Sequence, residues 1–202
     1  MAFSAPPTPK GARQAQEILD AALRCLGRDG FSATSLSRVA DEAGVSKRMV
    51  LYYFDSREAL FDQLAESIGE RLITALDDAI DGLEDPAEAV TAGFSEMWTA
   101  ITADRALLVA LFGVTTEAVT DARLDRTVSN FKDRFRDLLR KQLDLARANG
   151  RRITVDDDIA VTAVLAGFLG LALEWLERGD TPELEKTIGA FQAMLTSLAP
   201  PA

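Results

Sequence analysis

The residues at positions 47–54 include side chains that could bind DNA. Lys47 and Arg48 can each donate hydrogen bonds to a phosphate, and an arginine can also donate two to a single guanine. Met49 could contact the methyl group of a thymine. The alternative for the two cations is an ordinary pair of solvated charges, so the elements that hold them decide between the two interpretations.

Two short helices separated by a glycine turn are expected to present these side chains. The hydroxyl of Thr34 or Ser35 can cap a first short helix, and Gly44 ends it. The chain then turns into a second helix of about eight residues that ends near Phe54. This is the core of a helix-turn-helix, whose second helix lies in the major groove with its N-terminal part at the base edges.

The apolar residues of this segment are expected to form a small core that fixes the angle between the two helices. Gly44 most simply supplies the positive φ that the sharp turn requires. The core residues are predicted to be Val39, Ala40, Val45, Val50 and Phe54.

The stretch GFSATSLSRVADEAGVS at 30–46, together with YFDSREAL at 53–60, resembles the TetR family of repressors over about 45 residues. The resemblance implies that Tyr53 contacts phosphate and that Arg57 stands where the family usually has a lysine. Arg48 stands where the family usually has glycine and Leu51 where it usually has tyrosine, so base preference should differ and one phosphate contact should be lost. The expected DNA-binding residues are Thr34, Ser35, Ser46, Lys47, Arg48, Met49, Tyr52, Tyr53 and Arg57.

Charge is distributed unevenly along the chain. The net charge is −10, but residues 1–57 hold eight Lys and Arg against six Asp and Glu, so they carry +2 and the rest −12. A mildly basic head on an acidic body can still bind DNA, because only the docking face must attract phosphate. The chain has no histidine and one cysteine, Cys25, so we expect no catalytic residues, no metal site and no cofactor. We expect Cys25 to be buried and the protein to be cytoplasmic.

The rest of the chain has helical periodicity, which predicts an all-α fold of about nine helices. We expect a disordered tail at 1–11, a three-helix helix-turn-helix domain at 12–57 and a helical ligand-binding and dimerisation domain at 58–202. The predicted helices cover roughly 12–28, 36–43, 47–54, 57–82, 86–102, 106–114, 121–149, 156–178 and 182–198.

Large apolar side chains recur along the later helices. Their commonest role is ordinary core, but the family resemblance implies that some line a cavity for a small, lipophilic or aromatic effector. The candidates are Phe94, Met97, Trp98, Phe112, Phe131, Phe135, Phe168 and Trp175.

The helices at 156–178 and 182–198 are expected to pair with those of a second copy. The apolar run at 159–173 has only 15 residues, too few to span a membrane, and acidic residues bound it on both sides. The expected partners are therefore a double-stranded DNA operator, a small-molecule effector and a second copy, with no membrane. These expectations describe a repressor that its effector releases from DNA. Two alternatives are a DNA-binding regulator without an effector, and a helical enzyme or lipid carrier with a helix-turn-helix-like segment.

Overall fold

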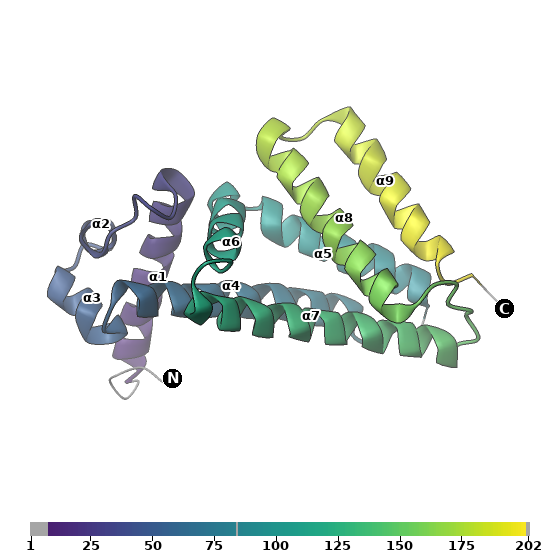
Figure 1. Cartoon of the computed structure of the whole chain (residues 1–202), viewed down its shortest axis with the longest axis horizontal. Coiled ribbons are helices and arrows are strands. Elements are labelled where there is room, and N and C mark those ends of the chain that lie inside the picture. Colours follow the sequence, from purple (N-terminus) through teal and green to yellow (C-terminus); the bar gives the residue numbers. More distant parts are fainter. Residues whose placement is uncertain (1–7, 84, 201–202) are drawn as a thin grey trace. The chain divides into compact units, whose positions relative to one another are not determined.

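The computed structural model describes residues 8–83 and 85–200, and the regular secondary structure of this part is nine α-helices (Figure 1). The predicted all-α fold is confirmed. The helices are α1 (Pro9–Asp29), α2 (Leu36–Glu42), α3 (Lys47–Phe54), α4 (Arg57–Ile80), α5 (Pro86–Thr102), α6 (Arg105–Glu117), α7 (Ala122–Ala148), α8 (Asp157–Arg178) and α9 (Pro182–Ser197).

Side-chain caps fix where several of these helices begin. Thr8 accepts the Gly11 N–H at 3.1 Å and Pro9 occupies the first turn, so α1 starts three residues before the predicted position 12. Residues 9–11 are therefore helical rather than part of a tail, and the rest of the expected tail, 1–7, lies outside the described residues.

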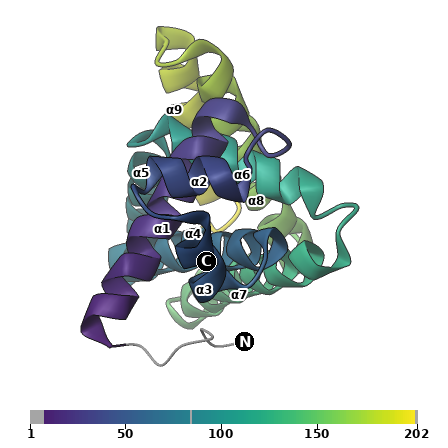
Figure 2. The same ribbon diagram turned by 90° about the vertical axis from the view of Figure 1, so that its left-hand side faces the viewer.

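The chain folds into two compact units, and both α4 and α7 contribute residues to each of them. Unit 1 comprises Met1–Glu70 and Asp104–Phe131. In it α1 packs on α2 and α6, and α2 packs on α3, as Figure 2 shows for the three N-terminal helices. Its core is built from fully buried side chains, among them Ile18, Leu26, Val39, Val50, Leu60, Phe61, Leu107 and Leu108.

Helices α1 and α6 approach each other closely at Gly27. A Cβ added to Gly27 would lie 2.1 Å from the Cβ of Ala106 and 2.4 Å from its Cα. Only a glycine fits there, because the obstacle includes backbone rather than the end of a flexible side chain.

Helices α4 and α7 are joined by side-chain contacts within unit 1. The Asp62 carboxylate of α4 accepts a hydrogen bond from Arg123 at 3.0 Å and another from the hydroxyl of Thr127.

Unit 2 comprises Arg71–Ala103 and Lys132–Ala202, and in it α5, α8 and α9 pack against one another. A Cβ at Gly167 would lie 2.3 Å from the Phe191 ring, so α8 and α9 approach closely there. Two ion pairs join α7 to the start of α8: Arg140 to Asp158, at 2.9 Å, and Arg147 to Asp157. Residues 152–154 pair with 198–200 through two backbone hydrogen bonds of 3.0 Å.

Helix α8 is strongly apolar, although little of it is buried. Its most apolar 18-residue window has a mean hydropathy of 2.0, and 22% of that window is buried. By length and composition alone this helix could cross a membrane, but a single such helix is weak support because helices of soluble proteins pass the same test. Ile159, Leu173 and, on α9, Met194 are large apolar side chains left exposed.

The contact between α1 and α6 leads to a prediction about stability. Gly27→Ala should destabilise the protein by about 1–3 kcal/mol, because the new methyl overlaps Ala106 and forces the helices apart. Gly113→Ala on α6 is the matched control, since a Cβ there has its nearest neighbour, the Cβ of Phe31, at an ordinary 4.0 Å. Urea unfolding of both variants measures the effect, and equal midpoints would contradict the proposed overlap.

Candidate DNA-binding site and effector cavity

A tight turn sets the angle between α2 and α3. Gly44 has a φ of 66°, as predicted, and the Val45 N–H donates to the Ala40 carbonyl at 2.9 Å across the turn. Ser46 then caps α3, because its hydroxyl oxygen accepts the Met49 N–H at 3.2 Å. Ser35 caps α2 in the same way, accepting the Arg38 N–H at 3.3 Å.

Apolar contacts inside the turn hold the two helices together. Val39, Ala40, Val50 and Phe54 are buried, which confirms four of the five predicted core positions. Val45, the fifth, is half-buried. Because α3 is amphipathic and buries Val50 and Phe54, most of its other side chains face outward.

The outward face of α3 carries most of the predicted DNA-binding side chains. Lys47, Arg48 and Met49 are exposed, and Tyr52 is 57% exposed. Tyr53 is half-buried, with its ring 5.2 Å from that of Tyr52 in an edge-on arrangement. Within the described ranges, neither Lys47 nor Arg48 has an ion-pair partner, so both cations are available to an anion.

Thr34 is buried, contrary to the expectation that it contacts DNA. It is 1% exposed, and its hydroxyl donates to the Gly30 carbonyl at 2.8 Å. The sequence could not show this, because the residue follows a turn whose direction depends on packing against other helices. Its hydroxyl therefore stabilises the loop before α2 from inside.

Arg57 is also engaged within the chain. Its guanidinium donates to the carbonyls of Phe31, at 2.7 Å, and Thr34, at 3.0 Å, and lies over the rings of Phe31 and Phe61 at 4.8 and 4.6 Å. A cation over aromatic rings is held by their negative faces. Arg57 thus ties the loop before α2 to the start of α4, which differs from the predicted contact with DNA.

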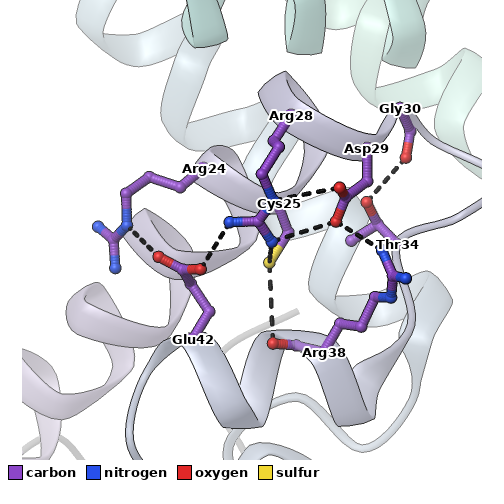
Figure 3. Close-up of polar contacts among 8 residues, drawn as sticks. All are labelled: Arg24, Cys25, Arg28, Asp29, Gly30, Thr34, Arg38 and Glu42. Carbon is purple, nitrogen blue, oxygen red and sulfur yellow. Dashed lines mark hydrogen bonds and ion pairs between the residues drawn. The ribbon is translucent and has the colours of Figure 1, made fainter.

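Five charged residues form a network between α1 and α2 that the sequence analysis did not single out (Figure 3). Glu42 accepts hydrogen bonds from Arg24 and Arg28, each at 2.9 Å. Asp29 accepts from Arg28 at 3.1 Å and from Arg38 at 2.8 Å. The only sequence signal is the alternation of charges near the ends of the two helices, which does not reveal partners 14 or 18 residues apart.

The network changes the acidity of its members. Hydrogen bonds from Arg28 and Arg38 lower the pKa of Asp29, and those from Arg24 and Arg28 lower the pKa of Glu42. Cys25 lies beneath, as predicted for a buried cysteine, with its thiol 3.8 Å from the Arg38 carbonyl oxygen. Burial raises the pKa of this thiol, which favours the neutral and unreactive form.

Unit 2 contains a cavity lined mostly by apolar side chains of α4, α5, α7, α8 and α9. It has a volume of about 140 Å³ and a mouth open to solvent, so it is smaller than the roughly 300–1,000 Å³ that is usual for small-molecule sites. The lining includes Leu76, Ile80, Val90, Leu139, Leu143, Val161, Val164 and Leu195.

Four of the eight aromatic and methionine candidates line this cavity: Phe94, Met97, Phe135 and Phe168. The other four do not. Trp98 stacks on Phe94 with ring centroids 5.8 Å apart, and the Trp175 indole N–H donates to Asp180 at 2.9 Å. Phe112 and Phe131 belong to unit 1. Most of the lining is aliphatic and was missed, because Leu, Val and Ala at helical spacing look the same in a cavity as in a core.

Comparisons with known proteins agree with this geometry. Residues 18–64 match the family model "Bacterial regulatory proteins, tetR family", and residues 86–200 match "BetI-type transcriptional repressor, C-terminal". The regulator YfiR of Bacillus subtilis, itself uncharacterised, is 32% identical over 146 residues, covering 67% of each chain. The repressor HdnoR of Paenarthrobacter nicotinovorans is 27% identical over 99 residues, which are 49% of this chain and 51% of that one. This chain therefore spans about half the length of HdnoR.

Solved structures share the fold. A TetR transcription regulator from Haloarcula marismortui superposes with a TM-score of 0.82 at 22% identity, covering 94% of this chain and all of the other. A helix-turn-helix with an outward cationic face, joined to a helical unit with a cavity, defines a DNA-binding transcriptional regulator. The chain belongs to the TetR family, and its C-terminal part is of the BetI type.

The charge network leads to a prediction about acid stability. Because the pKa values of Asp29 and Glu42 are lowered on folding, their stabilisation is complete above the ordinary carboxyl range and is lost as the pH falls through it, below about 4. The double variant Asp29→Asn/Glu42→Gln should therefore lose less stability than the wild type between pH 7 and pH 3.5, as measured by urea unfolding. Asp41→Asn, an exposed charge on α2 outside the network, is the control and should keep the wild-type pH dependence.

Proposed function

We propose that this chain is a repressor that binds a pseudo-palindromic operator as a homodimer. In this proposal α3 enters the major groove, with Arg48 and Met49 at base edges and Lys47 at phosphate. The main supporting observation is that α3 exposes these side chains, while Arg24 and Arg28 of α1 and Arg38 of α2 are engaged by carboxylates. Two recognition helices related by a two-fold axis then require two half-sites about 34 Å apart.

The remaining predicted contacts are assigned by their surroundings. Ser35 and Ser46 stand at helix starts, where hydroxyls and backbone N–H groups can meet phosphate. The exposed Tyr52 and the half-buried Tyr53 extend the same face. Thr34 and Arg57 are assigned to positioning the loop before α2, since their polar groups are already bonded inside the chain. By role, residues 12–57 form the DNA-binding domain and 58–202 the ligand-binding and dimerisation domain.

We assign dimerisation to α8 and α9. The supporting observation is that α8 is strongly apolar yet mostly unburied, with Ile159 62% exposed. Large apolar side chains left exposed together on a surface often mark a protein interface. A regulator that meets chromosomal DNA also has to reside in the cytoplasm.

We assign the cavity of unit 2 to a small lipophilic or aromatic effector that releases the repressor from DNA. Its apolar lining supports this, and HdnoR is by its name a nicotine-responsive repressor. Helix α4 is the proposed transmitter, because it starts at Arg57 and continues to Ile80 in the cavity lining. At 1.5 Å per residue its 24 residues span about 36 Å, so a small pivot at one end displaces the other.

Arg48→Ala and Arg57→Ala should have different effects on DNA binding. Loss of Arg48 should relax the preference at one base position at a cost of about 1–3 kcal/mol, because a base contact disappears. Loss of Arg57 should weaken binding to all sequences and lower the thermal stability, because the loop before α2 loses its attachment. Fluorescence anisotropy over an operator library and a salt series measures both effects.

Lys47→Ala is the comparison for the salt series. Removing one phosphate contact should reduce the slope of log K against log salt concentration by about 0.9. Arg57→Ala should leave that slope unchanged. If it reduces the slope as Lys47→Ala does, Arg57 binds phosphate and its assignment as a positioning residue is wrong. A uniform loss of affinity in Arg48→Ala would exclude base readout by that side chain.

Effector and operator should weaken each other's binding by the same factor, typically five- to 150-fold, because binding equilibria linked through one protein are reciprocal. Once a cavity ligand is available, its affinity is titrated with and without operator DNA. Equal affinities in the two titrations would favour the second candidate, a regulator whose C-terminal part only dimerises.

A further inference from the structure

The described lining of the cavity of unit 2 carries positive charge and no negative charge. Among the residues that the structure describes, no aspartate or glutamate lines it, and the polar side chains in the lining are Gln142, Arg151 and Thr196. The Thr196 hydroxyl is used, since it donates to the Gln192 carbonyl at 3.1 Å. Arg151 is thus the one charged side chain in the lining of this cavity among the described residues.

Arg151 is held in place by two contacts. Its Nη1 donates to the Ala199 carbonyl at 3.3 Å and its Nη2 to the Asp85 carboxylate at 2.8 Å. Its side chain is 21% exposed, so the guanidinium is partly withdrawn from water. The counter-ion comes from outside the lining: Asp85 caps α5, and the oxygen that meets Arg151 also accepts the Ala87 N–H at 3.0 Å.

The two ends of the cavity differ in character. Near Arg151 the lining comes from the start of α5 and the last residues of the fold, including Ala87 and Ala199. Further along α5 the lining is aromatic, and Phe94 meets Phe168 edge-on at 5.3 Å. Ala87 and Met97 are ten residues apart on α5, or about 15 Å. The lining therefore combines one cationic position with apolar walls, which suits an apolar body with one polar end.

Building on the proposed effector site, we propose that this cavity takes an apolar monocarboxylic acid whose carboxylate replaces Asp85 on Arg151. Such an exchange leaves the guanidinium paired, and the released Asp85 side chain, 44% exposed, can be solvated. A neutral analogue gains no ionic contact, because Arg151 keeps its resident partner. A cationic analogue meets Arg151 with no carboxylate in the lining to attract it.

The test compares three probes of equal chain length on the full-length protein: dodecanoic acid, dodecan-1-ol and dodecyltrimethylammonium. Titration calorimetry below the micellar concentrations should give the acid several-fold higher affinity than the alcohol, because the acid forms a new ion pair with Arg151 but must first displace Asp85 from the old one. The ammonium probe should bind most weakly.

Three substitutions locate the effect. Arg151→Gln should abolish the preference for the acid, whereas Arg152→Gln, which removes the same charge from a neighbour outside the lining, should retain it. Asp85→Asn removes the resident counter-ion but keeps a good capping residue, so it should strengthen acid binding several-fold. Circular dichroism verifies that each variant is folded.

Equal affinity for the acid and the alcohol, or unchanged acid binding in folded Arg151→Gln, would overturn the inference while leaving the cavity as the effector site. Weaker acid binding in Asp85→Asn would also overturn it, and that variant gives an answer even if Arg151→Gln does not fold. If none of the probes binds, the inference fails and so does the proposed use of the cavity by lipophilic ligands. The operator-binding part of the proposed function is judged separately, by the DNA titrations.

Discussion

The constraint on which unit 1 depends is the shortness of the two helices of its helix-turn-helix, α2 and α3. At seven and eight residues, α2 and α3 are below the length at which a helix is stable alone in water, so their direction must come from their attachments. The charge network attaches α2 to α1, and the buried side chains of α3 attach it to the core. Arg57 fixes the loop before α2 through two backbone carbonyls. Each exposed ion pair contributes little alone, but together they set one geometry.

The same contacts explain how a chain with a net charge of −10 can present a cationic face. On α1 and α2, carboxylates neutralise Arg24, Arg28 and Arg38, which removes these cations from competition for phosphate. The outward cations of α3 are left unneutralised in the described structure. The cationic face of this protein therefore depends on which charged residues are paired, and not only on how many of each sign the chain has. The positions of the acidic residues matter as much as those of the basic residues.

Local features of the sequence predicted most of the fold, because they act over a few residues. Gly44, Ser46 and the apolar positions around them specify the turn within one stretch of chain. What the sequence could not provide were contacts between distant residues: Arg57 with Phe31, 26 positions away, and Arg151 with Asp85, 66 positions away. Only half of the candidate cavity residues line the cavity, for a related reason. Aromatic residues can be picked out in a sequence as candidates, whereas the aliphatic residues of the lining cannot. Whether a leucine faces space or another side chain depends on the packing of five helices.

The crossing of α1 and α6 has a consequence for how this protein can vary over generations. The room between the two backbones admits no methyl group at position 27, because a Cβ there would lie 2.4 Å from the Cα of Ala106. The crossing therefore limits the identity of one residue rather than the combined bulk of two. A lineage that changed Ala106 to Gly would remove the nearer obstacle, the Cβ, but not the backbone behind it. Position 27 should consequently be inherited as glycine, and a suppressor of Gly27→Ala should not map to position 106.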